Sequence, residues 1–389
     1  MKLMLFTDTL GDVNGVSRFI QNVGSEAHRE GKRLQIVTST RFDLPDVPYI
    51  TNARPIFAAA MPGYKNLEIT LPPLVRMLRI ARRFRPDVIH ISTPGSVGLV
   101  GLAAAKMLRV PICGVYHTDF PAYIDHLFND GVYTRVCTDC MRSFYKRFNT
   151  IFTRSAGYMD SLEALGIDRS RMVRLTPGID LDSFRASDRD PNYWDSHPDI
   201  RRDSVKVLSC GRISVEKNLP LLTEIWPAIR SRARSGGKDA QLIVVGDGPY
   251  RSEMEAALAP HDAHFLGFRS GKELSTIYAS CDLFVFPSLT DTLGQVVIES
   301  QSAGLPVVVA SEGGPKEVVD DGRTGFVLPP HPADVWVDTV VGLITDSDRR
   351  TRMGQSAQSH AQQFTIAASF EHFWNVHADA ITGHPGAMV

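Results

Sequence analysis

The chain has 389 residues, of which 43% are hydrophobic and 22% are charged, a composition typical of folded globular proteins that excludes wholesale disorder. Its 42 lysines and arginines nearly balance its 43 aspartates and glutamates, so it lacks the overall positive field that gathers nucleic acid. Because one hydrophobic core seldom serves so long a chain, the length predicts two domains.

The first residues predict a buried strand rather than an export signal. Their apolar run ends at Asp8, before a signal sequence of sufficient length has formed. No stretch of the chain approaches the roughly 18 apolar residues that span a bilayer. We therefore expect a cytoplasmic protein, able to lie peripherally on the inner face of the plasma membrane.

The five cysteines do not indicate a disulfide framework in a chain of this length. Cys137 and Cys140 have the spacing of zinc ligands, but no second pair follows at such a spacing. Reduced structural thiols and no metal are expected.

Short apolar runs alternate with longer helical patterns through the first half of the chain. This alternation predicts βαβ units, and hence a parallel sheet. The predicted strands cover residues 2–7, 34–37 and 88–92, and the predicted helices cover residues 18–29, 73–84 and 96–108.

The pattern restarts after a polar segment at residues 185–203, with strands predicted at 205–210, 241–245, 283–286 and 306–309. The fold class is therefore α/β, with two Rossmann-like domains facing each other across a cleft. We assign residues 1–185 to the first domain and 200–365 to the second, and expect the helix in 366–389 to cross back to the first. Ligands of open parallel sheets bind at the carboxyl ends of the strands, so the loops that follow strands are the candidate sites.

Two such loops in the first half carry candidate residues. The loop from Asp8 to Val16 follows the first strand, and its glycines bring backbone close to a ligand. His117 ends another strand, with Thr118 and Asp119 beside it. The glycines at 95, 98 and 101 follow a third strand, but their spacing favours close helix packing over dinucleotide binding.

The most informative stretch is residues 286–309, which reads as a strand, a polar loop, a helix and another strand. If the helix starts near Thr292, Asp291 and Glu299 lie about 12 Å apart along its axis. That is too far for a glycosidase pair, and suits two ends of one elongated ligand. The backbone N–H groups of residues 293–295 offer a phosphate site between them. The alternative is a capped helix with Glu299 on a solvated face, and this stretch alone does not decide between the two.

The stretch 207–219 favours the functional interpretation. Arg212 follows a strand directly and Lys217 stands at a predicted helix start. Two cations at a strand end neutralise the charge that builds on a diphosphate leaving group. The alternative is a solvated surface pair, as is usual for Lys and Arg.

Two further glycine-containing loops follow strands. Gly246 and Gly248 let backbone approach a ligand, although taken alone this motif is more typical of a plain turn. The loop Gly313–Glu317 has two equally good interpretations. It contacts phosphate or hydroxyl groups, or it is a simple loop.

Two other patterns are interpreted as structural. Asp180 and Asp182 have the spacing of a metal-binding motif but lie in a turn, so we predict no metal. Residues 133–154 interleave basic and aromatic side chains, which suits an anionic bilayer, although an ordinary amphipathic surface helix is favoured.

These motifs, in this order, resemble the family-4 retaining glycosyltransferases of GT-B fold, and the likeness runs through nearly the whole chain. Asp291-x7-Glu299 resembles that family's E-x7-E element, and Gly211-Arg212 with Lys217 resembles its phosphate-binding pair. The stretches 246–249, 265–269 and 313–317 also follow the family's order. The loop from Asp8 to Val16 and the run 117–123 look most similar to members that glycosylate membrane lipids.

The resemblance implies transfer of a hexose from a UDP- or GDP-sugar, bound by the second domain, to an acceptor bound by the first. The family usually has Glu where this chain has Asp291, which leaves the identity of the sugar open. By resemblance, Arg212 and Lys217 bind the diphosphate, Glu299 the ribose, Phe268 and Arg269 the base, and His117 the transferred sugar. The expected catalytic residues are His117, Arg212, Lys217 and Asp291. The expected donor-binding residues are Gly15, Gly211, Gly246, Gly248, Phe268, Arg269, Thr292, Leu293, Gly294, Gln295 and Glu299. The expected acceptor-binding residues are Asp8, Val16, Thr118, Asp119 and Tyr123.

In the expected reaction the acceptor hydroxyl attacks from the face that the nucleotide leaves, and a departing phosphate oxygen takes the proton. No enzyme nucleophile, cofactor or metal is needed. The expected partners are the nucleotide sugar, a lipid or glycan acceptor and an anionic membrane surface, without nucleic acid. The alternatives are a nucleotide-sugar epimerase or a sugar phosphorylase on the same scaffold, or a non-catalytic nucleotide-sugar-binding protein.

Overall fold

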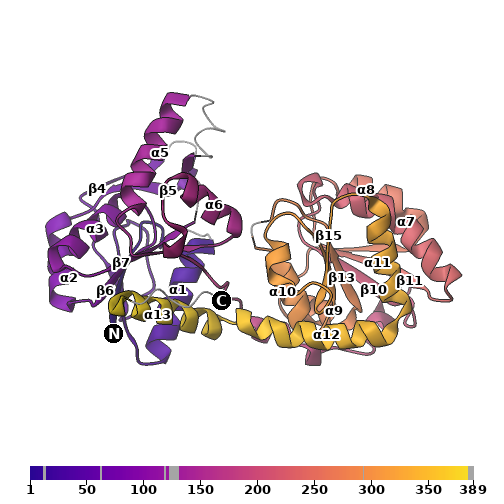
Figure 1. Ribbon diagram of the computed structural model, residues 1–389. Helices are drawn as coiled ribbons and strands as arrows, with labels where there is room; N and C mark the ends of the chain where they lie inside the picture. The colour runs from indigo at the N-terminus through magenta and orange to yellow at the C-terminus, as the bar shows by residue number, and fades with distance from the viewer. Residues whose placement is uncertain (12–14, 62–63, 118–119, 122–130, 292, 384–389) are drawn as a thin grey trace. The chain divides into compact units, whose positions relative to one another are not determined.

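The computed structural model describes residues 1–389 except 12–14, 62–63, 118–119, 122–130, 292 and 384–389. Its contacts divide the chain into an N-unit, made of residues 1–178 and 366–389, and a C-unit of residues 179–365 (Figure 1). The division comes earlier than the boundary at residue 185 that the sequence suggested. Ile179, Leu181 and Trp194 pack into a core cluster with the C-unit strands, which explains why this polar segment belongs to the C-unit.

The N-unit is built on a seven-stranded parallel sheet in the order β3-β2-β1-β6-β7-β8-β9. Its strands are β1 (Lys2–Phe6), β2 (Arg33–Thr38), β3 (Ile50–Asn52), β6 (Val88–Ile91), β7 (Ile112–Tyr116), β8 (Thr150–Thr153) and β9 (Met172–Arg174). Its helices are α1 (Gly15–Arg29), α2 (Leu74–Phe84), α3 (Ser96–Leu108), α5 (Gly131–Tyr145), α6 (Ala156–Ala164) and α13 (Ile366–Thr382). An antiparallel hairpin of β4 (Phe57–Met61) and β5 (Tyr64–Leu71) stands apart from this sheet.

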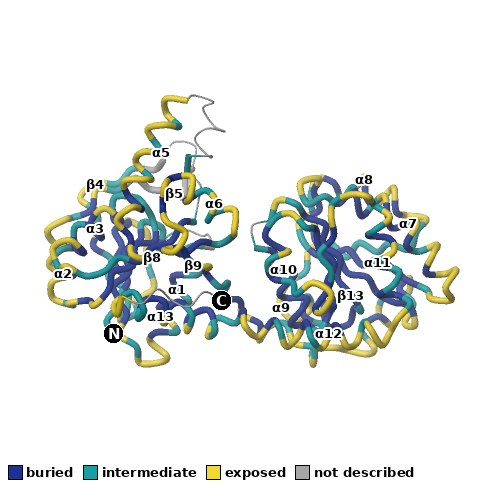
Figure 2. The backbone as a smooth tube through the Cα atoms, in the orientation of Figure 1, coloured by how far each residue is buried: buried dark blue, intermediate teal, exposed yellow. Residues whose placement is uncertain are grey.

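Helices cover both faces of the N-unit sheet because alternate residues of a strand point to opposite faces. In β1, Leu3 and Leu5 belong to a core cluster with residues of α1 and α13. Met4 and Phe6 belong to another cluster with residues of α2 and α3. The central strands β1, β6, β7 and β8 are correspondingly buried along most of their length (Figure 2).

The C-terminal helix α13 belongs to the N-unit although it follows the C-unit in the chain. It packs against α1, where Phe373 and Phe19 meet edge to edge with ring centroids 5.9 Å apart. Its last half reaches β6, where His377 contacts His90. The chain therefore passes between the two units twice.

The C-unit is built on a six-stranded parallel sheet in the order β12-β11-β10-β13-β14-β15. Its strands are β10 (Val205–Cys210), β11 (Ala240–Val245), β12 (Ala263–Gly267), β13 (Leu283–Phe286), β14 (Val307–Ala310) and β15 (Gly325–Leu328). Its helices are α7 (Leu219–Ser235), α8 (Arg251–Leu258), α9 (Gly271–Ser280), α10 (Gln295–Ser302), α11 (Ala333–Thr345) and α12 (Ser347–Ala361). The α/β class and the parallel sheet predicted for each half are confirmed.

Candidate functional site

Four loops that follow β10, β11, β13 and β14 meet at the carboxyl edge of the C-unit sheet, because these strands are parallel neighbours. The first two loops touch through glycines. A Cβ on Gly246 would stand 1.9 Å from the carbonyl oxygen of Gly211, and one on Gly248 would stand 2.3 Å from that of Ile213. These glycines are therefore required for the two loops to pack together.

An ion pair joins the two charged motifs that the sequence singled out. Lys217 ends a short 3₁₀ turn after β10, and Asp291 lies in the loop after β13. The Lys217 Nζ and Asp291 Oδ1 atoms are 2.8 Å apart, and the two side chains are only 20% and 25% exposed. Arg212 lies nearer to solvent, with its side chain 65% exposed and its Nη1 3.9 Å from Glu216 Oε1. Lys217 is thus the partly buried cation of this edge, and Arg212 is the exposed one.

The loop after β13 is also tied to the loop after β14. The backbone N–H of Gly314 donates to the carbonyl oxygen of Asp291 over 2.7 Å. A Cβ on Gly313 would stand 2.9 Å from the carbonyl oxygen of Leu289. Asp291 is therefore held through its backbone as well as through its side chain.

Helix α10 begins at Gln295, not near Thr292 as the sequence suggested. Gly294 precedes it in a left-handed conformation, with φ 70°, and a Cβ there would meet Pro315 at 2.9 Å. Leu293 is partly buried against a core cluster. The expected separation of about 12 Å along one helix axis therefore does not apply, because Asp291 lies in the loop before the helix.

Glu299 is buried inside α10, so the alternative that placed it on a solvated face is wrong. Its Oε1 accepts a hydrogen bond from Gln295 Nε2 over 2.8 Å, and its Oε2 accepts one from the Tyr278 hydroxyl over 3.2 Å. Burial raises the pKa of this carboxyl, against these two hydrogen bonds. Tyr278 lies in α9 and had no signal in the sequence, because no motif contains it.

Three buried oxygen atoms at this edge have no hydrogen-bond partner among the described residues: Ser214 Oγ, Ser288 Oγ and Asp291 Oδ2. An unpaired buried polar group costs about 1–3 kcal/mol, so such atoms are rare and mark places where a ligand or water binds. Sequence analysis missed both serines. Their positions in loops that follow strands, with Ser214 between Arg212 and Lys217, were the available signal.

The residues expected near the base follow the adjacent strand β12. Phe268 is 75% exposed, and Arg269 donates through Nη1 to the Phe268 carbonyl oxygen over 3.0 Å. The backbone N–H of Gly246 donates to the carbonyl oxygen of Gly267 over 2.9 Å, which joins this loop to the glycine loops. The C-unit thus brings the described donor-site candidates of residues 211–299 to one edge of its sheet.

In the N-unit, the Asp8 carboxylate caps helix α3. Its Oδ1 accepts from the Val97 backbone N–H over 2.8 Å, and its Oδ2 accepts from the Thr93 hydroxyl over 2.6 Å. Gly95 accommodates this arrangement, since a Cβ there would stand 2.6 Å from the carboxylate. Asp8 therefore holds the loop after β6 in place. Val16 is partly buried in α1 against the core, and Gly15 begins that helix.

His117 follows β7 and faces the loop after β6. Its Nε2 lies 3.4 Å from Ser92 Oγ, and its Nδ1 is buried without a partner in the described part of the chain. Burial and the nearby Arg154 guanidinium hold the pKa of His117 well below its usual range, so the ring is neutral at pH 7. Arg154, which the sequence grouped with a surface stretch, is instead a largely buried cation near His117 in the N-unit. Thr118, Asp119, Tyr123 and Thr292 lie outside the described residues.

The patterns interpreted as structural have local roles. The Asp180 carboxylate accepts from the Asp182 N–H and the Ser183 hydroxyl, capping a short turn. Within the described residues, no group of three or more His, Cys, Asp or Glu side chains is placed to hold a metal ion. In the basic and aromatic stretch 133–154, the rings at positions 144, 145, 148 and 152 are buried in the core.

Comparisons with known proteins identify both halves of the chain. Residues 13–183 match the family model described as Glycosyltransferase Family 4, and residues 194–360 match the one described as Glycosyl transferases group 1. No helix in the described part of the chain is both long and apolar enough to cross a membrane.

Three curated relatives are similar along most of the chain. A GDP-mannose-dependent alpha-mannosyltransferase of Mycobacterium tuberculosis is 32% identical over 97% of this chain and 94% of its own length. The sulfoquinovosyl transferase SQD2 of Arabidopsis thaliana is 31% identical over 90% of this chain, which spans 66% of the plant protein. An alpha-monoglucosyldiacylglycerol synthase of Streptococcus pneumoniae is 26% identical over 79% of this chain and 70% of its own length.

The fold is also that of a solved structure. Alr3699/HepE of Anabaena, crystallised in complex with UDP, matches 97% of this chain and 100% of its own with a TM-score of 0.69 at 18% identity. This likeness shows the GT-B fold, which has two Rossmann-like domains in one chain. The motifs, the two family models and the mannosyltransferase relative together show that the chain belongs to the family-4 glycosyltransferases of GT-B fold.

Proposed function

We propose that the protein is a retaining transferase that moves a hexose from a UDP- or GDP-sugar to a membrane lipid. The observation that carries this proposal is the Lys217–Asp291 pair, which joins two loops beside the unpaired Ser214, Ser288 and Asp291 oxygen atoms. A donor diphosphate binding there competes with Asp291 for the Lys217 ammonium. Once released, the Asp291 carboxylate is free to accept hydrogen bonds from the hydroxyls of the sugar.

In the proposed reaction the acceptor oxygen forms a bond to the anomeric carbon as the bond from that carbon to the phosphate oxygen breaks. The electron pair leaves with the diphosphate, whose oxygen takes the acceptor proton. The increase of negative charge on the diphosphate is what Lys217 and Arg212 stabilise. The neutral His117 ring offers an uncharged hydrogen-bond partner for the sugar.

In this proposal Glu299 binds the ribose of the nucleotide, and the residues after β12 bind its base. Each Glu299 oxygen already accepts one hydrogen bond, and a carboxylate oxygen has lone pairs for a further donor such as a ribose hydroxyl. We propose that the exposed ring of Phe268 and the backbone of Arg269 contact the base. Support for the choice between UDP and GDP is divided, because one relative is named as GDP-mannose-dependent and the Anabaena structure contains UDP.

A basic, partly apolar helix supports a lipid acceptor and peripheral attachment to the cytoplasmic face of a membrane. Helix α2 and its C-cap residue expose five arginines, at positions 76, 79, 82, 83 and 85, none of which has a carboxylate within 4 Å among the described residues. Leu74 and Val75 at its start are 47% and 68% exposed. Unpaired cations beside exposed apolar side chains fit an anionic lipid surface. We propose α2 as the membrane-facing surface, in place of the stretch 133–154, where the rings at positions 144, 145, 148 and 152 are buried in the core.

Product analysis tests the proposed reaction. The purified chain is incubated with UDP-glucose, UDP-galactose or GDP-mannose, with and without diacylglycerol dispersed in detergent, and the products are separated and examined by NMR. We expect an acceptor-dependent glycolipid whose anomeric configuration matches that of the donor. Inversion would refute the retaining mechanism. Conversion of the donor without acceptor would establish an epimerase. Dependence of the reaction on inorganic phosphate would establish a phosphorylase. Binding of the donor without turnover would establish a non-catalytic protein.

A further inference from the structure

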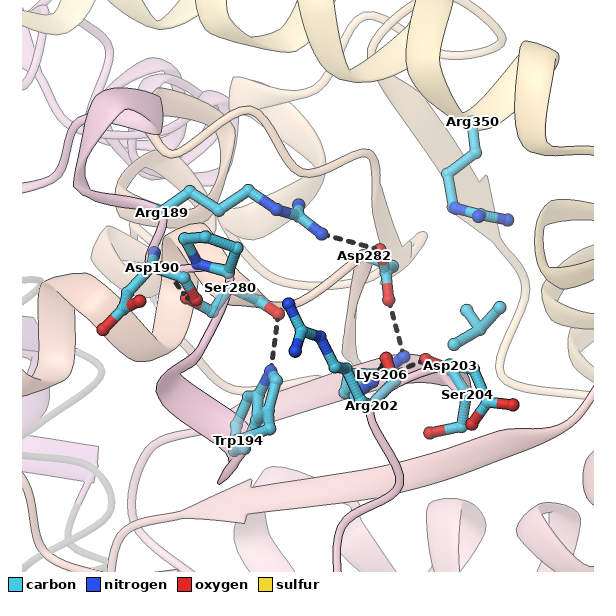
Figure 3. A pocket seen from close by; sticks show the side chains of 12 residues that line it. Arg189, Asp190, Trp194, Arg202, Asp203, Ser204, Lys206, Ser280, Asp282 and Arg350 are labelled. Carbon is cyan, nitrogen blue, oxygen red and sulfur yellow. Dashed lines mark hydrogen bonds and ion pairs between the residues drawn. The ribbon is translucent and has the colours of Figure 1, made fainter. Parts of the chain in front are cut away.

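A cavity of about 220 Å³ lies where strands β10 and β13 begin, at the amino edge of the C-unit sheet (Figure 3). Four cationic side chains from three segments line it: Arg189, Arg202, Lys206 and Arg350. Gly211, at the proposed donor site, follows the same strand as Lys206. At about 3.3 Å per residue of strand, the two positions are roughly 16 Å apart. The cavity is therefore separate from the donor site.

Two of the four cations have a carboxylate nearby but not in close contact. Arg189 Nη2 lies 3.6 Å from Asp282 Oδ1, and Arg202 Nη1 lies 3.6 Å from Asp195 Oδ2. Direct hydrogen bonds between charged nitrogen and oxygen atoms are about 2.7–2.9 Å long. Each guanidinium has five N–H donors, so both retain donors for a further anion.

Lys206 and Arg350 have no carboxylate within 4 Å among the residues that the structure describes, and contact carbonyl oxygens instead. Lys206 Nζ donates to the Arg202 and Ser204 carbonyls over 2.6 and 2.8 Å, and Arg350 Nη1 donates to the Leu343 carbonyl over 2.7 Å. Lys206 is only 3% exposed, in a strand that is buried along its whole length. Burial lowers the pKa of Lys206, against the attraction of the Asp282 and Asp203 carboxylates.

The acidic residues of the lining are largely committed to backbone groups. Asp282 Oδ2 accepts from the Lys206 backbone N–H over 2.8 Å, and Asp190 Oδ1 accepts from the Asn192 N–H over 2.9 Å. Asp203 is exposed at the rim. Four cations against three carboxylates leave an excess of one positive charge. In Figure 3, Arg189 extends toward Asp282, and Arg350 comes from a different segment.

We propose that this cavity is a second anion site, which binds the phosphate group of a small phosphorylated metabolite between Arg350, Arg202 and Lys206. A dianionic phosphate supplies the acceptors that the guanidinium and ammonium groups lack, and Arg matches its geometry with paired donors. The volume is below the roughly 300–1,000 Å³ of pockets for drug-sized ligands, which limits the ligand to a small molecule. Buried Trp194, whose Nε1 donates to the Ser280 carbonyl over 2.9 Å, gives the cavity one rigid wall.

Calorimetric titration of the full chain with inorganic phosphate, in chloride buffer at constant ionic strength, tests the site. We expect saturable binding in the wild type. Arg350→Gln and Arg202→Gln should each weaken it about tenfold or more, as for loss of a hydrogen bond to a charged group. Arg352→Gln, an exposed arginine on the same helix that is not part of the lining, is the matched control and should leave the affinity unchanged. Absence of saturable binding in the wild type would overturn the proposal.

The donor site also attracts phosphate, so the same titration is made with Lys217→Ala. Phosphate binding that persists in Lys217→Ala and weakens in Arg350→Gln supports the second site, whatever the outcome for the transferase reaction. The reverse pattern, or equal affinity in all variants, overturns it. Glucose 6-phosphate is titrated in parallel. Tighter binding than that of inorganic phosphate identifies a sugar phosphate as the ligand, and equal binding identifies the phosphate group alone.

Discussion

His90 and His377 share a buried hydrogen bond that fastens the last helix of the chain to the central strands of the N-unit. The His90 Nδ1 and His377 Nε2 atoms are 3.0 Å apart, and both side chains are inaccessible to solvent. His377 Nδ1 donates to the Phe373 carbonyl oxygen over 2.6 Å, so in the neutral ring its Nε2 accepts from His90. In this arrangement the accepting ring of His377 has to be neutral.

Acid should release α13 before the rest of the N-unit unfolds. Burial lowers the pKa of His377 to about 4, against about 6.5 in an unfolded chain, so the unfolded state binds more protons between these values. Stability is therefore fully present above about pH 6.5 and is lost as the pH falls toward 4, by on the order of 2 kcal/mol at pH 5. Hydrogen exchange of α13 peptides, corrected for intrinsic rates, measures this loss.

The variant His377→Gln separates titration from packing. The glutamine keeps an acceptor for His90 but does not ionise. We expect the hydrogen-exchange protection of α13 to be lower than in the wild type at pH 7.5. We also expect this protection to change less between pH 7.5 and 5 than it does in the wild type. The exposed His331→Gln is a control for titration elsewhere in the chain. A variant with the full wild-type pH dependence would show that another group is responsible.

Removal of the Lys217 ammonium should impair transfer rather than folding. We expect Lys217→Ala to lower kcat/KM on the order of 10²-fold, as for loss of one preorganised charge partner of the leaving group. Lys238→Ala, an exposed lysine elsewhere in the C-unit, should have no effect. Steady-state kinetics with the donor found in the product analysis measure both, and wild-type rates in Lys217→Ala would contradict the assignment.

The variant Asp291→Asn should separate diphosphate binding from sugar transfer. The amide no longer holds the Lys217 ammonium as an ion pair, so that cation becomes available and the nucleoside diphosphate should bind more tightly than in the wild type. Transfer should fall, because the sugar loses its carboxylate contact. Calorimetry with UDP and GDP and the transfer assay give the two readouts, and a parallel fall in both would mean that Asp291 does not restrain Lys217.

Asp8 should contribute mainly to stability. Its carboxylate caps α3, and loss of such a cap costs about 0.5–2 kcal/mol, so Asp8→Ala should lower the unfolding free energy of the N-unit by that amount. Asp8→Asn should recover part of this unfolding free energy, because the amide oxygen still accepts a hydrogen bond. Asp43→Ala, a change at an exposed position, should leave the unfolding free energy unchanged. Urea unfolding followed by α3 hydrogen exchange measures the effect. Full stability of Asp8→Ala would leave a role in acceptor binding as the better interpretation.

Vesicle sedimentation tests the proposed membrane surface on α2. Each basic side chain near an anionic surface contributes about 1 kcal/mol, so glutamine at Arg79, Arg82 and Arg83 should weaken binding to phosphatidylglycerol vesicles by on the order of 10²-fold. Binding should also fall in high salt and be weak on phosphatidylcholine alone. The matched triple change at Arg135, Lys146 and Arg147 removes the same charge from the other basic stretch. A greater loss there would move the surface to that stretch.

The sequence was sufficient to predict elements whose pattern is local. The fully buried runs at β10 and β11 restart the βαβ alternation after a polar segment, and this predicted a second parallel sheet. The hairpin of β4 and β5 was missed because its strands pair with each other outside the main sheet. Position after a strand was enough to select Arg212, Lys217 and Asp291, since parallel strands bring such loops to one edge.

Contacts between distant segments were decided by the tertiary structure alone. Gly294 lies against Pro315 in a left-handed conformation before α10, and Tyr278 from another helix binds the buried Glu299. The cavity around Lys206 likewise combines segments that no single motif contains. Periodicity and motif spacing report on neighbours along the chain, whereas burial, ion pairing and pKa depend on the order in which the strands pair. The sequence by itself therefore determined the family and the edge of the sheet that carries the site, and only the folded chain decided which charges meet there.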